Sequence, residues 1–382
     1  MTPTSATSLV PADNAFALLA VLFLLTAVGA ALEKTGIGKR VSGVMLVIAI
    51  AIALAQFDII PSSAPVYDVI WTYLVPLAIA LFLLRADLVS IVVDGGRTLV
   101  AFLFGAVGVV AGAWLGARLL DLGPFEAEYA AVFSATYVGG SLNFAAVAEA
   151  VGFRDPTALA TGVAIDNVLG LGYLLLAGAA ATWSVFRSRF AWRAELLTGA
   201  VGDADDAARV PTVIDLALAL GLATLACAAG IELAARLGQP AYAILYITLA
   251  MVAIATLGSR WLKSIAGPEL AATLFMYLFF AMLGAGADLG AMWGAAPALF
   301  VYVLVIFAVH IVFLLVGARI CRLNHAEIVI ASTACIGGPP IAIAFAVLFG
   351  WRRLAVAAVA TGVLGYVLGN FVGIGVYEVV AP

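Results

Sequence analysis

The stretch FSATYVGGSLNFAAVAEAVGF (residues 133–153) returns near the C-terminus as IASTACIGGPPIAIAFAVLFGW (residues 330–351). Each copy has a Gly-Gly pair near the middle of an apolar run, with small hydroxyl residues just before the pair. Paired glycines interrupt a helix because their backbone is free to leave the helical conformation. Interrupted apolar segments at matching places in two halves are typical of transport sites in membrane proteins.

Other landmarks repeat in the same order along the chain. An acid that closes an apolar run recurs as Asp87 and Asp288, and the tetrapeptide ATGV recurs at residues 160–163 and 360–363. These pairs and the two Gly-Gly pairs are all about 200 residues apart. A single match between Ala- and Leu-rich helices carries little weight, but a series at one spacing predicts two homologous halves.

Composition excludes a soluble domain. Of the 382 residues, 65% are hydrophobic and 10% are charged, and the mean hydropathy is +1.18. A helix needs about 20 apolar residues to cross a bilayer. Twelve segments are predicted, at residues 15–32, 41–57, 67–84, 98–120, 127–151, 157–183, 212–235, 241–258, 269–287, 295–318, 326–350 and 354–379. The first should remain as a membrane helix, because no Lys or Arg precedes it as in a cleavable signal peptide.

Charge and cysteine content exclude several other classes of partner. The net charge of −4 is spread over short loops, so nucleic acid is not an expected partner. Cys227, Cys321 and Cys335 share no metal-ligand spacing, and His310 and His325 are too few to complete a site. No disulfide framework, metal centre or other cofactor is therefore expected. The sequence has no Walker motif, so this chain alone is not expected to use ATP.

One long polar stretch, residues 184–211, divides the halves and contains four arginines and three aspartates. Its first part, FRSRFAWRAELL, mixes aromatic residues with arginines and predicts an amphipathic helix on the membrane surface. Its second part is typical of a linker. We expect a first repeat over residues 1–183, a cytoplasmic linker over 184–211 and a second repeat over 212–382.

The distribution of Lys and Arg predicts the topology, because short cytoplasmic loops are enriched in them. If all twelve segments cross, the 18 basic residues divide nine to nine. If both Gly-Gly segments enter and leave on one side, only Arg118, Arg154 and Arg236 lie opposite the linker. The other 15 then share the linker side: Lys34, Lys39, Arg40, Arg85, Arg97, Arg187, Arg189, Arg193, Arg209, Arg260, Lys263, Arg319, Arg322, Arg352 and Arg353.

This assignment leaves five crossings in each half, and an odd number turns the second half upside down relative to the first. The predicted fold class is an all-α polytopic membrane protein of two inverted repeats, each with about five transmembrane helices and one glycine-broken segment. A rival assignment, in which the sixth segment folds back, divides the charges 14 to 4. The count therefore leaves open whether the broken segments re-enter or cross. Both termini are expected outside and the linker inside a bacterial inner membrane.

A broken helix exposes backbone amides and carbonyls that lipid cannot satisfy, so the break must line a protein or water cavity. Helix N-termini there suit a carboxylate, and unwound carbonyls suit Na⁺. The expected solute-binding residues flank the two breaks: Thr136, Gly139, Gly140, Ser141, Asn143, Thr333, Gly337, Gly338 and Pro339. The alternative interpretation is that these small residues only allow close helix packing.

Asp166 and Asn167 stand inside the apolar run of residues 159–181. An acid at such a position costs several kcal/mol and is a functional candidate by default. The matching helix of the second half carries Asn370 but no acid at the matching position. We expect Asp166, Asn167 and Asn370 to take part in cation coupling, with Na⁺ near Asn143 and Asp166, or Asp166 to carry a proton. A structural, hydrogen-bonded acid is the alternative.

Other polar residues have plainer interpretations. Glu149 lies near the outer end of its arm and is expected at the water interface. Asp87 and Asp288 close equivalent segments and are expected to be helix-end residues. His310 is alone in an apolar segment, and we interpret it as a packing residue in preference to a proton relay.

The paired segments TYVGGSLNFAAVAEAVG and STACIGGPPIAIAFAVLFGW, with the acid of AIDN at residues 164–167, resemble the YjcL-like family of bacterial integral membrane proteins over the whole chain. More distantly, the plan is similar to sodium/glutamate symporters, 2-hydroxycarboxylate transporters and bile acid/sodium symporters. That resemblance implies inverted halves, a solute site at paired broken segments and a core that moves against a scaffold. The Pro-Pro pair at residues 339–340 departs from the polar pair after the first break.

Together these features predict a secondary transporter that moves a small organic anion or an amino-acid-like solute with Na⁺ or H⁺. The moving core is expected from residues 98–183 and 295–380, and the scaffold, with a homodimer contact, from 15–97 and 212–294. A channel that uses the breaks as a fixed filter is the second hypothesis. A membrane-embedded enzyme is the third, but the sequence has no GxSxG motif, so no enzymatic activity is expected.

Overall fold

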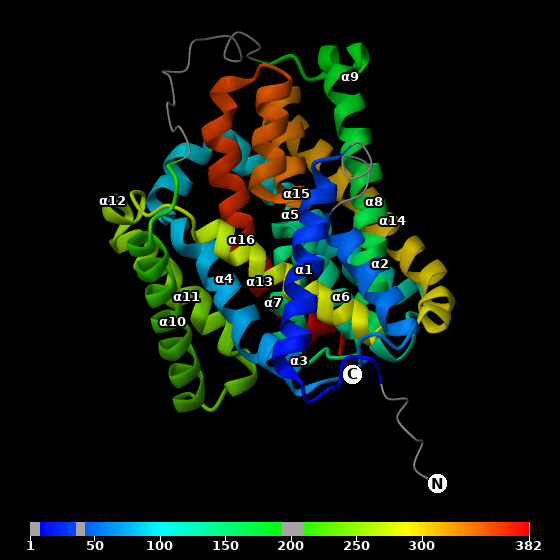
Figure 1. Cartoon of the computed structure of the whole chain (residues 1–382). Helices are drawn as coiled ribbons and strands as arrows, with labels where there is room; N and C mark the ends of the chain where they lie inside the picture. The colour runs from blue at the N-terminus through cyan, green and yellow to red at the C-terminus, as the bar shows by residue number, and fades with distance from the viewer. Residues whose placement is uncertain (1–7, 36–42, 193–208, 382) are drawn as a thin grey trace.

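The computed structural model describes residues 8–35, 43–192 and 209–381, and all regular structure within these ranges is helical (Figure 1). Ten of the described helices are long and apolar enough to cross a membrane. The all-α polytopic fold class is therefore confirmed. Lys39, Arg40 and Arg193 of the charge argument, and the linker from 193 to 208, lie outside the described residues.

The predicted segments coincide with single helices or with joined pairs. The first half contains α1 (Ala15–Glu33), α2 (Gly43–Gln56), α3 (Pro65–Val69), α4 (Val75–Phe82), α5 (Leu88–Leu119), α6 (Glu126–Gly139), α7 (Leu142–Ala150), α8 (Pro156–Thr182) and α9 (Ser184–Arg189). A π-helical turn joins α3 to α4. The second half contains α10 (Val213–Arg236), α11 (Ala243–Leu257), α12 (Ser259–Leu262), α13 (Pro268–Gly286), α14 (Leu289–Ile320), α15 (His325–Leu348) and α16 (Ala355–Val380).

Helices α5 and α14 begin earlier than the segments predicted from residues 98 and 295. Asp87 caps α5 by accepting from the Val89 amide at 3.1 Å, and Asp288 caps α14 by accepting from the Gly290 amide at 2.7 Å. Each capping acid starts a helical stretch before the predicted segment, which a search for apolar windows cannot detect. In α5 this stretch ends at a kink at Gly96, with φ 50° and ψ −132°, so the segment predicted from residue 98 corresponds to the part of α5 after the kink. Both acids are therefore helix-end residues, as predicted.

Both glycine-broken segments fold back on themselves. The residues that flank the α6–α7 segment meet, because the rings of Phe125 and Phe153 lie 5.2 Å apart. The two ends of α15 meet in the same way, with the rings of His325 and Trp351 5.5 Å apart. Each segment is therefore a hairpin with both ends on one side, which is one of the two alternatives that the charge count left open.

Glycine conformation makes each hairpin turn. Gly140, between α6 and α7, has φ 89° and ψ 170°, and Gly338, inside α15, has φ 71° and ψ −172°. A positive φ is strained for residues that carry a Cβ atom. The two tips also touch, since a Cβ atom on Gly140 would lie 3.3 Å from the Gly338 amide nitrogen.

The hairpins approach each other from opposite ends of α16. Going along α16, Gly362 packs on Pro339 of one tip, Gly365 packs on the Val138 carbonyl of the other, and Gly373 packs on the Ala131 carbonyl further down α6. The α15 hairpin therefore lies beside the first part of α16, and the α6–α7 hairpin lies beside the rest. The relation of the two whole halves as inverted repeats stays a prediction.

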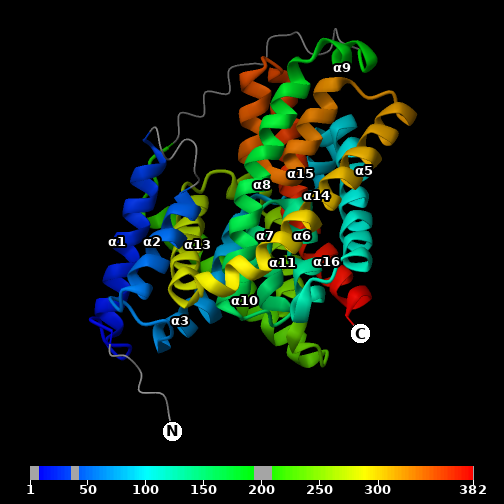
Figure 2. The ribbon, with the colours of Figure 1, turned by 90° about the vertical axis from the view of Figure 1, so that its right-hand side faces the viewer.

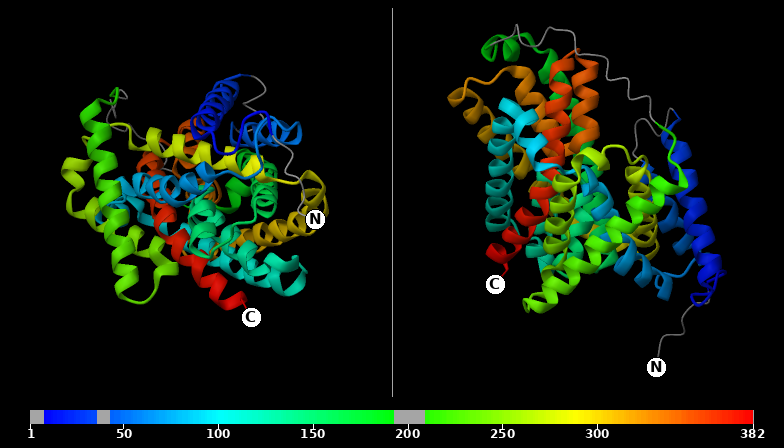
Figure 3. Two further views of the ribbon diagram at one scale, coloured as in Figure 1. Left: turned by 60° about the horizontal axis from the view of Figure 1, so that its bottom comes forward. Right: turned by 90° about the vertical axis from the view of Figure 1, so that its left-hand side faces the viewer.

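The helices form two bundles. Helices α5 to α8 pack mainly with α14 to α16, and α1, α2, α4, α10, α11 and α13 pack mainly on one another. Figure 2 shows α1, α2 and α13 standing to one side of the group that contains α5, α14 and α15, and Figure 3 shows the same separation from two other directions. The start of α1 and the end of α16 lie at the end of the molecule opposite α9 (Figure 1).

Candidate functional site

The α6–α7 tip lies against the acid of α8. The Ser141 hydroxyl donates to Asp166 Oδ2 at 2.8 Å, and the Asp166 residue is only 6% exposed. The hydroxyl of Tyr137, one turn before the break, also interacts with this carboxylate. The Tyr137 hydroxyl makes no hydrogen bond of good geometry to any described residue. A buried carboxylate and two hydroxyl groups therefore gather at one hairpin tip.

Local sequence explains why α8 passes the tip at Asp166. Asp155 caps α8 by accepting from the Ala158 amide at 2.8 Å, and Pro156 follows at the first turn. Gly162 then allows close approach to the Phe144 ring, because a Cβ atom there would lie 2.9 Å from it. One turn later the helix reaches the tip, and Asp166 faces it.

Asp166 has no cationic partner among the described residues. The ion pairs found there join Arg85 to Glu269, Arg97 to Glu327, Arg154 to Glu149, Arg209 to Asp215 and Arg236 to Glu232. A buried carboxylate without a cation or a proton costs several kcal/mol. The site therefore has the electrostatics of a position that takes up a cation or a proton.

A second polar cluster lies on the other side of the α6–α7 tip. Asn143 Nδ2 donates to the Tyr366 carbonyl at 2.9 Å and to Asn370 Oδ1 at 3.1 Å. Asn370 Nδ2 in turn donates to Thr248 Oγ1 of α11 at 3.0 Å. Asn143, Asn370 and Thr248 are buried, so this chain of hydrogen bonds links α7 and α16 to a helix of the other bundle.

The structure places the predicted site residues in two groups. Ser141 and Asp166 face each other, whereas Asn143 and Asn370 pair on the α16 side of the tip. The predicted Na⁺ position near both Asn143 and Asp166 therefore spans two faces of the hairpin. Asn167 Nδ2 donates to the Val163 carbonyl of its own helix at 2.8 Å.

The two predicted threonines also bond within their own helices. Thr136 Oγ1 donates to the Val132 carbonyl at 2.6 Å, and Thr333 Oγ1 donates to the Val329 carbonyl at 2.9 Å. Such back-bonding uses the hydroxyl hydrogen of each residue locally. The lone pairs of both oxygens stay available to a cation, but neither hydroxyl is a free donor to a solute.

The second tip differs chemically from the first. Gly337 and Gly338 meet the α6–α7 tip, but Pro339 and Pro340 begin the returning arm. Proline has no backbone N–H, so this arm lacks two of the donors that a helix N-terminus normally offers to an anion. The amides at the start of α7 are therefore the better anion partner, and the α15 tip offers mainly carbonyl oxygens.

A buried hydrogen-bonded chain lies deeper in the same bundle. His310 Nδ1 contacts the Gly105 carbonyl at 2.9 Å, and its Nε2 contacts Ser332 Oγ at 3.0 Å. Ser332 Oγ also contacts the Tyr173 hydroxyl at 2.6 Å. Both nitrogens of His310 have partners, which suits the predicted packing role. Tyr173 was missed, although its position two turns after Asp166 places both on one face of α8.

Little free space remains at the tips. A cavity of about 10 Å³ lies between the Asn143–Asn370 cluster and the α4 residues Ile79 and Phe82. About one water molecule needs that volume. The described residues also contain no group of three His, Cys, Asp or Glu side chains that could hold a metal ion.

The comparisons with known proteins agree with this architecture. The family described as "Protein of unknown function (DUF819)" matches residues 20–381. The "Uncharacterized membrane protein YjcL" of Bacillus subtilis (strain 168) is 30% identical over 385 residues, which cover 96% of this chain and 97% of that protein. A family match over nearly the whole chain, with a membrane-protein relative that aligns over nearly the whole of both chains, shows that the chain belongs to the DUF819 family.

Proposed function

We propose that this membrane protein is a secondary active transporter in which Asp166 binds the coupling cation. One observation carries the proposal: a buried acid without a cationic partner in the described structure lies at the meeting point of two re-entrant hairpins. Two broken helices that meet inside a membrane protein supply backbone groups able to replace the water around an ion or a solute.

Charge balance supports a cation at Asp166. The carboxylate is stable in this environment only when it is protonated or when a cation neutralises it. Ser141 holds one of its oxygens at 2.8 Å, and the Tyr137 hydroxyl is available as a further oxygen ligand. Oxygen ligands of this kind suit Na⁺, so the leading choice is Na⁺, and H⁺ is the alternative.

The solute proposed is a small organic anion or an amino-acid-like molecule. The amides at the start of α7 suit a carboxylate, and Gly139, Gly140 and Ser141 allow the solute to approach the backbone closely. The α15 tip, with its carbonyls and Pro339, would contribute shape and cation contacts. An ammonium group on the solute would share the Asp166 side of the site.

The proposed mechanism is elevator-type alternating access. The bundle of α5 to α8 with α14 to α16 would carry both hairpins past the second bundle, which would act as the scaffold and form a homodimer. We place the protein in the bacterial inner membrane with the linker in the cytoplasm. No enzymatic activity and no cofactor other than the coupling ion are proposed.

Thermal stability tests the cation site. Purified protein in detergent would be melted at increasing NaCl, with choline chloride at equal ionic strength as the control. A ligand that binds only the folded state stabilises it by about 2.7 kcal/mol at 100 times its Kd. We expect Na⁺ to raise the melting temperature of wild type and not that of Asp166→Asn. The matched variant Asp121→Asn, an exposed acid at the end of α5, should keep the Na⁺ effect.

Uptake into proteoliposomes distinguishes a carrier from a channel. Saturable, gradient-dependent uptake and exchange of labelled solute would support a carrier, whereas non-saturating flux would support a channel. A melting temperature that responds to pH but not to Na⁺, again only with Asp166 intact, would assign the coupling to protons. If Asp166→Asn keeps normal coupled uptake, Asp166 is a packing residue and the proposal fails.

A further inference from the structure

The internal duplication allows the two ends of the molecule to be compared with each other. Each half has a sharp elbow before its long helix, from α4 into α5 in the first half and from α13 into α14 in the second. Each elbow lies near the start of the helix that follows a hairpin, which is α16 for the first elbow and α8 for the second. The two contacts should be alike in a symmetric molecule, and they are not.

The elbow at the end opposite the linker is closed against α8. The Asp288 amide donates to Thr157 Oγ1 at 3.0 Å. A Cβ atom on Gly286 would lie only 2.6 Å from Pro156 Cβ, so the backbone of the elbow packs directly on the first turn of α8. The elbow and the first turn of α8 are therefore in direct contact at Gly286 and Pro156, and the nearby cavity of about 500 Å³ begins beside this contact.

The elbow on the linker side stands away from α16. Arg85 and Val356, the counterparts of Gly286 and Pro156, both line a cavity of about 510 Å³. The first amide of α5, that of Leu88, instead donates to Thr256 Oγ1 of α11 at 3.2 Å. The elbow therefore stays with the scaffold bundle, and a cavity replaces the contact that closes the opposite end.

This cavity approaches the hairpin tips more closely than two cavities at the opposite end of the described structure do. Its lining includes Ile343, which is five residues beyond the turn glycine Gly338, and Val363, which follows the glycine that packs on Pro339. Two cavities at the opposite end, of about 500 and 480 Å³, are lined there by residues near the hairpin bases and by the surface loops. Neither reaches a tip residue.

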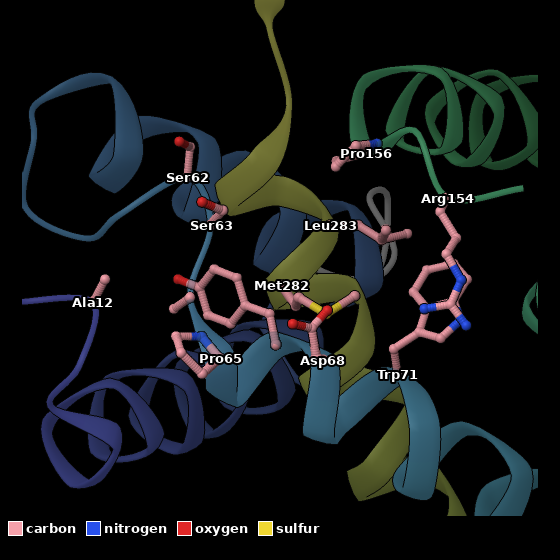
Figure 4. Close-up of a pocket in the computed structure, with 12 residues that line it drawn as sticks. Ala12, Ser62, Ser63, Pro65, Asp68, Trp71, Arg154, Pro156, Met282 and Leu283 are labelled. Carbon is pink, nitrogen blue, oxygen red and sulfur yellow. The ribbon is translucent and has the colours of Figure 1, made fainter. Parts of the chain in front are cut away.

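Figure 4 shows one of these two outer cavities, the one between Trp71, Arg154 and Leu283. Arg154, from the α7–α8 connection, lies over the Trp71 ring at 5.0 Å, and the two side chains close one side of the cavity. The same guanidinium bonds both carboxylate oxygens of Glu149 at 3.1 and 3.2 Å. The ion pair lies within the hairpin bundle and positions the guanidinium, and the cation–π contact with Trp71 joins this bundle to the scaffold at this end.

The chemistry of the cavity on the linker side suits an aqueous path. Its mouth carries the Arg85–Glu269 ion pair, 2.9 Å long, and the charged residues Asp87 and Lys263. Val359 and Val363 form an apolar floor nearer the tips. The rings of Phe82 and Tyr366 lie 6.0 Å apart, and both residues line the small cavity at Asn143, close in sequence to Leu84 and Val363 of the large cavity.

We infer that this cavity is the solute pathway on the linker side, that the Phe82–Tyr366 ring pair is its inner barrier, and that the structure represents a conformation open toward the linker. The role of the cavity as a solute pathway rests on the proposed transport function. Its openness to water on one side rests only on geometry. The two parts can be tested separately.

A pair of cysteine substitutions related by the duplication tests the openness. Val359 lines the cavity and is 42% exposed, whereas its counterpart Leu159 is fully buried. Val359→Cys and Leu159→Cys would be treated in membrane vesicles with a charged, membrane-impermeant thiol reagent applied to one face at a time. A C-terminal epitope, which lies opposite the linker, reports vesicle orientation. Peptide mass spectrometry distinguishes the label from that on native cysteines.

We expect at least tenfold faster labelling of Val359→Cys than of Leu159→Cys, and only when the reagent is on the linker side. Equal labelling, or labelling of Val359→Cys from the epitope side, would overturn the inference. Labelled Val359→Cys should also lose gradient-driven uptake, and unchanged uptake after complete labelling would show that the cavity is not the pathway. Absence of uptake in the unlabelled protein would count against the proposed function, while the labelling result would stand on its own.

Discussion

At the scale of single residues, Asp166 dominates the chemistry. It is buried, it accepts a hydrogen bond from Ser141 at 2.8 Å, and none of the ion pairs in the described structure includes it. Every other polar residue near the tips is neutral or back-bonded to its own helix. In the proposed function a cation or a proton balances the charge of Asp166, and the Ser141 hydroxyl beside it is expected to contribute to the affinity for that ion.

Ser141→Ala should weaken Na⁺ binding by roughly 10- to 100-fold. A hydrogen bond to a charged group contributes about 1.5–3 kcal/mol, and each 1.4 kcal/mol corresponds to about tenfold in affinity. The NaCl concentration that gives half the rise in melting temperature measures the effect. Ser134→Ala is the matched control, because the Ser134 hydroxyl bonds the Ala131 carbonyl within α6 at 2.9 Å. Equal Na⁺ dependence of both variants would contradict the assignment.

At the scale of elements, the molecule depends on turns and caps that glycine and aspartate make. The two tips use the same device, a second glycine with positive φ after a helical first glycine. The elbows before α5 and α14 also share a device, an aspartate that caps the next helix. Such local signals are short in sequence, but they decide where each long helix starts and which segment folds back.

Gly140→Ala should lower the melting temperature. The substitution forces a residue with a Cβ atom to keep φ 89° and ψ 170°, which costs roughly 1–3 kcal/mol, and it crowds the Gly338 amide at 3.3 Å. Gly221→Ala in α10 is the control, because no atom lies within 4 Å of its Cβ position. That control should be neutral or stabilising by up to about 1 kcal/mol. A Gly140→Ala protein as stable as wild type would exclude the turn geometry described.

Asp87→Ala should destabilise the elbow by about 1 kcal/mol through loss of the α5 cap, and Asp87→Asn by less, because Asn is also a good cap. Partial burial acts to raise the pKa of Asp87, but hydrogen bonds from Ser90 and the Val89 amide and the charge of Lys263 outweigh it and lower the pKa. The stabilisation is therefore present at neutral pH and is lost as the pH falls through the lowered pKa.

Melting curves from pH 7 to pH 3 measure this contribution. The difference in melting temperature between wild type and Asp87→Ala should shrink as Asp87 becomes protonated. The difference between Asp87→Asn and Asp87→Ala should change little, since neither residue titrates. If wild type still melts at a higher temperature than Asp87→Ala at a pH below the lowered pKa, the carboxylate charge is not the source of the stability.

At the scale of the whole molecule, two bundles meet along an interface that is mostly apolar. The Asn370–Thr248 hydrogen bond at 3.0 Å crosses this interface where both residues are buried. Near the surface, the Arg154–Trp71 contact crosses it at the end opposite the linker. In the proposed elevator mechanism, movement of one bundle past the other would break both contacts, and they would therefore bias which conformation is populated.

Thr248→Val should lower the free energy of unfolding by about 1–3 kcal/mol, because the Asn370 amide loses a buried acceptor. The melting temperature should fall accordingly. Thr273→Val is the matched control. Both hydroxyls donate to the carbonyl four residues earlier in their own helices, but Thr273 is exposed and bonds no residue of the other bundle. If the two variants melt alike, the Asn370–Thr248 contact does not hold the bundles together.

Much of the fold could be predicted from the sequence, because crossing a bilayer imposes a length and an apolar composition that a single segment reveals by itself. All twelve segments were found, apart from residues 41–42, which lie outside the described ranges. The bias of Lys and Arg left open whether the two glycine-broken segments cross or fold back as hairpins. The early starts of α5 and α14 were not predicted, because capping by Asp87 and Asp288 depends on geometry that hydropathy ignores.

The sequence by itself determined a helical membrane protein with two glycine-broken segments and singled out Asp166, since an acid in an apolar run is costly wherever the helix packs. Only the tertiary structure decided that the two tips meet, that Ser141 and Asn143 face different helices, and that Tyr137, Tyr173 and Thr248 join the polar clusters. These partners are brought together by packing between distant segments. The sequence of one helix does not determine which neighbouring helix each of its faces contacts. It also does not determine which end of the molecule is closed.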